Sequence, residues 1–386
     1  MILHDPGFTY ASATAAALWL GLLALPWQPW RARERLEAAG ATPDADLSSI
    51  VVLIPARNEA ATIGHTLTAL AAQGRNLKTI LIDDQSSDGT VDAARRAAGT
   101  GLTIEIVSGA TLEPGWAGKM FALEQGRARA DRPLILLLDA DIALEPGTIA
   151  ALLEKQRETG AALVSLMAEL SMQGWAERLL MPAFVYFFKL VYPFALSNRP
   201  TGLVAAAAGG CVLIERAALD GIGGFGTLKG AIIDDCALAC TVKRSGRRTW
   251  IGLSHAAKSI RSYQTLGTIW RMVARSAYTQ LHYSPVLLGL ASLMLALAFW
   301  MPLVALAAFP VLDAKLIGGL ALLAMMASYL PTLLYYRRSP LWALALPLIG
   351  TLYLAMTWSS TLDYWRGSRT VWKGRTYDRG MHARGP

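Results

Sequence analysis

Hydrophobic positions divide the chain into long uncharged stretches near its two ends and a middle region of shorter apolar runs. Residues 6–30 carry no charged side chain. A stretch of this length can cross the ~30 Å hydrocarbon core of a bilayer as a helix. Three more uncharged stretches cover residues 283–312, 316–336 and 339–362. The pattern predicts three to four membrane spans, because a proline and a glycine inside the last stretch also suit a re-entrant segment.

Charges beside the apolar stretches predict how the chain is oriented. Arg31, Arg33 and Arg35 follow the first stretch at once, and no positive segment precedes it. This polarity is the reverse of a cleaved signal peptide, and it predicts an anchor over residues 1–30 with the following residues in the cytoplasm. We therefore expect a multi-pass protein of the inner (cell) membrane. The basic tail, residues 363–386, also favours the cytoplasm, whereas four spans would place it outside; both predictions stay open.

The middle region, residues 48–282, alternates short apolar runs with helical stretches. Strands are predicted at 50–54, 79–82, 102–107, 133–138 and 161–166, and helices at 58–73, 90–98, 119–130 and 147–159. Alternation of this kind predicts an α/β fold with a mostly parallel, buried sheet. In such sheets the ligand binds at the carboxyl ends of the strands.

Other segments do not follow that alternation. Residues 31–47 are predicted to be a charged linker ahead of the α/β domain. Residues 179–196 are apolar and aromatic but contain a lysine and two prolines. They suit either an interfacial segment or a hydrophobic core helix. Residues 283–362 are assigned to C-terminal membrane helices.

Charge and cysteine content narrow the class of protein. The net charge is +8, but no basic patch with interleaved aromatic residues is present, so a nucleic-acid partner is not expected. Basic residues lie mainly beside the apolar stretches, where they suit contacts with anionic lipid. The three cysteines, Cys211, Cys236 and Cys240, form no C-x-x-C motif. We expect buried reduced thiols rather than a disulfide framework or a zinc site.

The first candidate for chemistry is the turn after the strand predicted at 50–54, which reads P-A-R-N-E. Pro55, Arg57 and Glu59 are its candidate substrate-binding residues. Backbone groups at such a strand end can hold a planar base. Alone the signal is weak, because many α/β folds contain a similar turn.

The second candidate follows the strand predicted at 79–82. Asp83, Asp84 and Asp88 lie within D-D-Q-S-S-D-G-T. Their carboxylates can accept hydrogen bonds from a base N–H or from ribose hydroxyls. Helix capping is the structural alternative, because Asp and Ser are good N-caps. Capping accounts for Asp88 but not for two acids together at a strand end.

Two further acidic pairs complete the set. Asp139 and Asp141 come directly after an apolar run, where paired carboxylates suit a hard divalent cation, Mg²⁺ or Mn²⁺. Asp234 and Asp235 are adjacent, and one of them can act as a general base on a hydroxyl. Taken alone, an adjacent pair is more often the solvated start of a helix.

The order of these four motifs resembles family 2 of the glycosyltransferases, the inverting GT-A type. The resemblance covers about residues 48–280 and implies a GT-A nucleotide-diphospho-sugar transferase fold. It also implies that the first two motifs bind the nucleoside. Asp141 would be the main metal ligand with Asp139 near ribose or metal, and Asp235 would be the base, supported by Asp234.

Several features resemble the lipid-directed members of that family. Lys119 ends a G-W-A-G-K segment similar to the W-x-G-K element near the donor; a plain surface lysine is the alternative. Residues 208–216 resemble the acceptor-side strand. Arg275 can stand for the arginine of the Q-x-x-R-W box, but its Gln and Trp are missing, which puts processive polymer synthesis in doubt. Arg271 precedes Arg275 by one helical turn, so a juxtamembrane basic helix is the alternative.

The overall arrangement, with one leading span and several trailing ones, resembles the bacterial hopanoid-associated glycosyltransferases and, more distantly, the ceramide glucosyltransferases. It implies an inverting transfer of a sugar from a nucleotide-sugar donor to a membrane lipid, linked to hopanoid biosynthesis. A polyprenyl-phosphate or other glycolipid glycosyltransferase is the nearest alternative. A non-catalytic membrane scaffold with a relic transferase domain is an alternative of another class, against which the retained acids argue.

Overall fold

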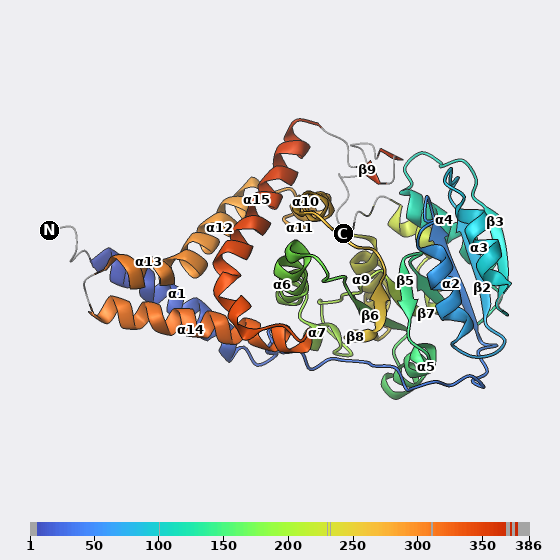
Figure 1. Cartoon of the computed structure of the whole chain (residues 1–386), viewed down its shortest axis with the longest axis horizontal. Helices are drawn as coiled ribbons and strands as arrows, with labels where there is room; N and C mark the ends of the chain where they lie inside the picture. Colours follow the sequence, from blue (N-terminus) through green and yellow to red (C-terminus); the bar gives the residue numbers. More distant parts are fainter. Residues whose placement is uncertain are drawn as a thin grey trace. The chain divides into compact units, whose positions relative to one another are not determined.

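A computed structural model describes residues 6–99, 101–229, 231, 233–309, 312–367, 371–372 and 375–376 of the chain (Figure 1). These residues form two compact units. The first unit takes its residues from Met1–Arg33, Met172–Ala195 and Tyr263–Ser368, and the second from Glu34–Ser171, Leu196–Ser262 and Arg369–Pro386. Each unit is therefore built from three separate segments of the chain. In particular, residues 172–195 belong to the helical unit although they lie in the middle of the sequence.

The second unit is built on an eight-stranded sheet. Its strands are β1 (Ile50–Ala56), β2 (Lys78–Asp83), β3 (Thr103–Ser108), β4 (Leu134–Leu138), β5 (Ile142–Leu144), β6 (Leu163–Glu169), β7 (Cys211–Glu215) and β8 (Thr249–Ser259), in the order β3-β2-β1-β4-β7-β6-β8-β5. Strand pairs β1–β2, β2–β3, β1–β4 and β6–β8 are parallel, and pairs β4–β7, β6–β7 and β5–β8 are antiparallel. The predicted α/β fold with a mostly parallel sheet is confirmed, although β5 and β8 were not predicted.

Helices cover both faces of this sheet. They are α2 (Ile63–Ala71), α3 (Thr90–Ala98), α4 (Gly118–Arg127), α5 (Thr148–Thr159), α8 (Arg216–Gly221) and α9 (Asp234–Arg244), with a short η2 turn (Gly224–Leu228). Strand β1 is apolar at every position because both of its faces are buried. Its side chains alternate between a core shared with α2 and α5 and a core shared with α4 and α9, so every position is buried.

Helix α2 begins later than predicted. The sequence pattern placed its start at residue 58, but Asn58 has a φ of 52° and the helix begins at Ile63. The prediction was wrong because the turn after β1 extends over Glu59, whose carbonyl accepts hydrogen bonds from Thr62 and Ile63 N–H. This longer turn keeps Glu59 beside the strand ends.

The region predicted as a linker is partly attached to the sheet. Leu36 N–H donates to the Leu253 carbonyl, and Leu253 N–H donates to the Glu34 carbonyl. Residues 34–36 therefore run beside β8 and are hydrogen-bonded to it, whereas a linker was predicted here.

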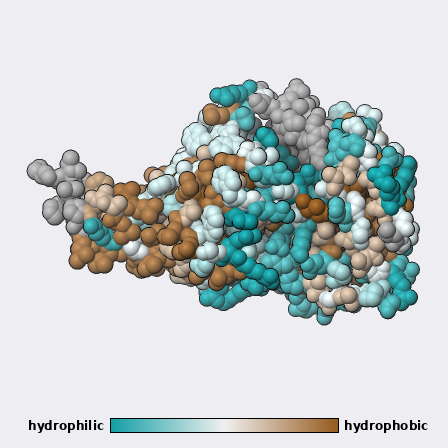
Figure 2. Space-filling model, in the orientation of Figure 1, coloured by the Kyte–Doolittle hydropathy of each residue, from teal (hydrophilic) through white to brown (hydrophobic). Residues whose placement is uncertain are grey.

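The first unit is helical. It contains α1 (Pro6–Ala24), α6 (Trp175–Val191), α10 (Leu266–Ala274), α11 (Ala277–Gln280), α12 (Pro285–Leu295), η3 (Ala296–Trp300), α13 (Met301–Ala308), α14 (Leu312–Tyr335), η4 (Pro340–Ala345) and α15 (Leu346–Trp365). The short α7 (Phe194–Ser197) lies where the chain leaves this unit, and a β9–β10 pair (Val371–Trp372, Arg375–Thr376) follows α15. Among the described residues, four stretches are long and apolar enough to cross a membrane: Gly7–Ala24, Pro285–Ala308, Leu312–Tyr335 and Pro340–Trp365. Figure 2 shows a largely hydrophobic surface over α1, α13 and α14.

Helix α6 covers most of residues 179–196, for which the sequence suited either an interfacial segment or a hydrophobic core helix. Tyr186 is fully buried, and its hydroxyl lies 2.7 Å from the Ser328 hydroxyl of α14. The Tyr353 hydroxyl donates to the Leu180 carbonyl at 2.8 Å, and buried Lys189 donates to the Arg31 carbonyl. These contacts support the core-helix alternative, because α6 packs inside the first unit.

Candidate active site

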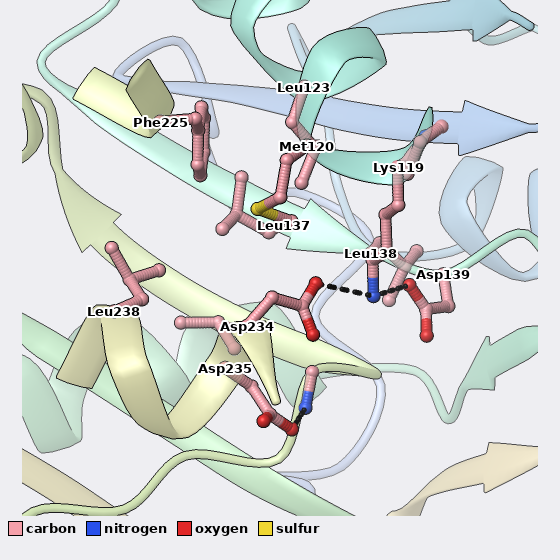
Figure 3. Close-up of a pocket in the computed structure, with 13 residues that line it drawn as sticks. Lys119, Met120, Leu123, Leu137, Leu138, Asp139, Phe225, Asp234, Asp235 and Leu238 are labelled. Carbon is pink, nitrogen blue, oxygen red and sulfur yellow. Dashed lines mark hydrogen bonds and ion pairs between the residues drawn. The ribbon is translucent and has the colours of Figure 1, made fainter. Parts of the chain in front are cut away.

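The candidate site is a pocket in the second unit, where β4 ends and α4 and α9 begin (Figure 3). Its polar residues come from different elements: Lys119 from the first turn of α4, Asp139 from the loop after β4, and Asp234 and Asp235 from the first turn of α9. Its other lining residues are Pro55, Met120, Leu123, Leu137, Leu138, Gly209, Val212, Phe225 and Leu238. The fold thus gathers four of the predicted polar site residues in one place, together with Pro55.

Lys119 is the central cation of the pocket. Its Nζ lies 2.7 Å from Asp139 Oδ1 and 4.0 Å from Asp234 Oδ2, as the dashed lines in Figure 3 show. Burial by itself would lower the pKa of Lys119, but the charge of Asp139, followed by that of Asp234, outweighs burial and raises it. Lys119 therefore stays protonated at neutral pH and holds carboxylates of β4 and α9 together.

Asp235 is fixed by the backbone. Gly209 N–H donates to Asp235 Oδ2 at 2.8 Å, and Cys236 N–H donates to Oδ1 at 2.8 Å. A Cβ on residue 209 would lie only 3.3 Å from Lys119 Nζ and 3.4 Å from Asp235 Oδ2, so glycine permits this close approach. Burial, followed by the charge of Asp234, raises the pKa of Asp235 to about 6. Asp235 is thus held in one orientation and exchanges its proton near neutral pH.

Asp139 and Asp141 lie on the two sides of the turn between β4 and β5. Burial raises the pKa of Asp139, and the neighbouring charge of Asp141 adds to the increase although Lys119 opposes it. Asp141 Oδ2 lies 2.6 Å from Arg261 Nε. Arg261 Nη2 also contacts Glu59 Oε1 at 2.6 Å and Oε2 at 2.8 Å. Arg261 was not predicted from the sequence; the only signal was its position just after β8.

The donor atoms at Asp139 and Asp141 suit a divalent metal shared with a ligand. Within the part of the chain that the structure describes, no group of three or more His, Cys, Asp or Glu side chains could hold a metal ion by itself. Mg²⁺ and Mn²⁺ commonly bind through one or two carboxylates, with water and phosphate oxygens filling the other positions. Two carboxylates, each now beside a cationic side chain, fit such a shared site.

A second cluster of predicted residues lies where β1 and β2 end. Arg57 Nη1 donates to the Asp84 carbonyl at 2.5 Å and lies 3.9 Å from Asp84 Oδ2. Asp84 N–H donates to the Ala56 carbonyl at 2.8 Å, so the two strand ends are joined. Asp83 accepts Ser86 N–H at 3.3 and 3.4 Å. Hydrogen bonds therefore hold the loops after β1 and β2 together. Neither Arg57 nor Asp83 nor Asp84 lines the pocket around Lys119.

Asp88 has a clear structural contact set. Its Oδ1 accepts from the N–H of Thr90 at 3.1 Å and from the Thr90 hydroxyl at 2.5 Å, and its Oδ2 accepts from Ala60 N–H at 3.1 Å. The N-cap of α3 is Gly89, so Asp88 lies one residue before it. Its bonds tie the start of α3 to the turn after β1, which is a structural role. A role for Asp88 in substrate binding stays a prediction.

Arg275 lies in the first unit, at the C-cap of α10, where its N–H donates to the Arg271 carbonyl at 3.2 Å. Its predicted role toward the diphosphate stays a prediction. The cysteines are free; Cys211 and Cys236 are buried as predicted, whereas Cys240 is only partly buried.

Comparisons with known proteins agree with this geometry. Residues 51–223 match the model of the family described as glycosyl transferase family 2. A 4,4'-diaponeurosporenoate glycosyltransferase of Staphylococcus aureus (strain bovine RF122 / ET3-1) is 35% identical over 94 residues, 24% of each chain. Its counterpart in strain MRSA252 is 32% identical over 113 residues, 29% of each chain. The chain thus matches only 24% and 29% of the length of these relatives.

One solved structure resembles nearly the whole chain. The mannosyltransferase PcManGT from Pyrobaculum calidifontis, solved with GDP-Man and Mn²⁺, superposes with a TM-score of 0.56 and 20% identity, covering 92% of this chain and 99% of that chain. At this identity the likeness concerns the fold. Residues 51–223 therefore match the family 2 glycosyl transferase model, and the second unit, which holds most of them, has the GT-A fold.

Proposed function

We propose that this protein is an inverting membrane glycosyltransferase that moves a sugar from a nucleotide-sugar donor to a lipid acceptor. The observation that carries the proposal is the position of Asp235, a carboxylate held by two backbone N–H groups beside Lys119, Asp139 and Asp234. A base with a pKa of about 6 is ionised at neutral pH and still accepts a proton effectively.

In the proposed reaction, Asp235 takes the proton of the acceptor hydroxyl. The oxygen attacks the anomeric carbon from the face opposite the diphosphate, so a new C–O bond forms while the bond to the donor phosphate breaks. The nucleoside diphosphate leaves with that electron pair, and the configuration inverts. Lys119 provides a fixed positive charge beside the reacting groups.

Asp139 and Asp141 would hold a divalent metal, Mg²⁺ or Mn²⁺, together with the donor diphosphate. When bound, such an ion neutralises charge that develops on the leaving group. The loops that contain Arg57, Asp83 and Asp84 would bind the nucleoside, since strand ends of this kind face the ligand in open α/β sheets.

A lipid acceptor and a membrane location are supported by separate observations. The four apolar helices of the first unit suit a multi-pass protein of the inner membrane, and Arg31, Arg33 and Arg35 suit a cytoplasmic catalytic domain. The relatives named for 4,4'-diaponeurosporenoate support a lipid as the acceptor. The hopanoid link rests on the family resemblance alone.

The experiment compares detergent-purified wild type with Asp235→Asn. Each is incubated with labelled nucleotide sugars, Mg²⁺ or Mn²⁺, and total bacterial lipid extract that contains hopanoids. We expect wild type to label a lipid and the variant to lose about 10³-fold in rate while still binding donor, because Asn cannot accept the proton.

Equal labelling by both proteins would reject Asp235 as the base and favour a phosphate acceptor such as polyprenyl phosphate, which needs no strong base. Absence of both labelling and donor binding would favour the scaffold alternative. The labelled lipid itself identifies the acceptor and tests the hopanoid link.

A further inference from the structure

Arg261 joins two residues that lie far apart in the sequence. One edge of its guanidinium bonds Asp141 at 2.6 Å, and its Nη2 bonds both oxygens of Glu59 at 2.6 and 2.8 Å. The side chains of Glu59 and Asp141 are only 10% and 15% exposed. Two nearly buried carboxylates therefore share one cation, which balances part of a negative charge that water reaches poorly.

The contact with Asp141 occupies a carboxylate that the proposed function assigns to the metal. While Arg261 Nε lies 2.6 Å from Asp141 Oδ2, its positive charge competes with a divalent ion at this carboxylate, because the two cations repel each other. Breaking this one contact does not release Arg261, since its two bonds to Glu59 remain. Arg261 can therefore give up Asp141 and keep its other partner, provided that a metal ion takes over the charge of Asp141.

We propose that Arg261 is an exchangeable counter-ion that makes metal binding depend on the nucleotide; the inference rests on the proposed function. In the empty protein Arg261 neutralises Asp141 and opposes binding of a free divalent ion. A nucleoside diphosphate brings negative charge, which lowers the repulsion between metal and guanidinium and offers Arg261 a new anionic partner. Metal and nucleotide therefore bind cooperatively through Arg261.

The test measures Mn²⁺ binding by the full detergent-purified chain, from the electron paramagnetic resonance signal of free Mn²⁺. The variants are Arg261→Gln and a matched control, Lys258→Gln. Lys258 lies in β8, three residues before Arg261, and pairs with a carboxylate, Glu145, at 2.5 Å, but it is 49% exposed. Both variants remove one positive charge, so the control corrects for the general field of the protein.

We expect Arg261→Gln to bind Mn²⁺ alone about tenfold more tightly than wild type, within the range of ordinary coupling between sites. Lys258→Gln should change the affinity by less than about threefold, as an exposed pair does. Added UDP or GDP should tighten Mn²⁺ binding more in wild type than in Arg261→Gln, because only wild type has a counter-ion to displace.

Equal or weaker Mn²⁺ binding by Arg261→Gln would overturn the proposal and indicate that Arg261 merely positions Asp141. Circular dichroism checks folding; if the Gln variant does not fold, Arg261→Lys serves instead. The ammonium of Lys lacks the planar fork that contacts Asp141 and Glu59 at once, so Lys must show tighter Mn²⁺ binding than wild type, or the proposal fails. Lipid labelling is measured separately, so loss of the proposed transferase activity would not be confused with this result.

Discussion

The chain contains two adjacent acidic pairs whose surroundings differ. Asp83 and Asp84 end β2, are 9% and 2% exposed, and belong to loops joined by backbone hydrogen bonds. Asp234 and Asp235 begin α9, line a pocket and share it with Lys119. Both pairs have a cation about 4 Å away, Arg57 for the first and Lys119 for the second, but only the second pair lines the pocket. The comparison teaches that the place of an acidic pair in the fold, and not its sequence pattern, decides its chemistry.

The largest effect among the variants that probe this difference is expected from Lys119→Met. Removing the cation leaves Asp139 and Asp234 without their shared charge partner, so kcat should fall about 100-fold, comparable to loss of one preorganised charge-stabilising group. Steady-state kinetics measures the loss. Lys119→Arg keeps the charge and serves as the control. If Lys119→Met loses no more rate than Lys119→Arg, the charge of Lys119 does not contribute to the reaction.

The pH dependence of transfer tests Asp235 directly. Its pKa is raised to about 6 by burial, so it is protonated and inactive as a base below that value. We expect kcat/KM to rise about tenfold per pH unit up to about pH 6 and to level off above it. In Lys119→Met the acidic limb should move to higher pH, because Lys119 lowers the pKa of Asp235. A limb that stays in place would contradict the assignment.

The smallest effect is expected at the first pair. Asp83→Asn keeps the shape of the side chain but removes its charge, so the KM for the donor should rise about tenfold, the size of a lost charged hydrogen bond. The value of kcat at saturating donor should stay within about twofold. A fall in kcat without a change in KM would show that Asp83 contributes to the transfer step and not to donor binding.

Much of the sheet was predictable because its strands are buried on both faces. The apolar run of β1 reveals a strand even without its partners, and the strand–helix alternation places β2 and β4 beside it. Asp139 follows β4 and Asp235 lies in the first turn of α9, and both line one pocket.

The parts that sequence reasoning missed depend on contacts between distant residues. Strand β8 was missed because its apolar residues are interrupted by Gly252, Ser254, His255 and Lys258. It therefore lacks the continuous apolar run that predicts a buried strand. Arg261 follows that strand, and its partner Asp141 lies 120 positions earlier in the chain. The late start of α2 has a local cause, which is the positive φ of Asn58. The spacing of hydrophobic residues carries no information about this backbone angle.

The burial of α6 has a consequence for the synthesis of the chain. Tyr186 bonds Ser328, a residue 142 positions later, and the helix also packs against α15. During translation α6 therefore emerges well before the helices that cover it. The nascent chain must keep this apolar helix shielded, by the bilayer surface or by a chaperone, until α14 is made, so the last third of the protein completes a core begun in the middle.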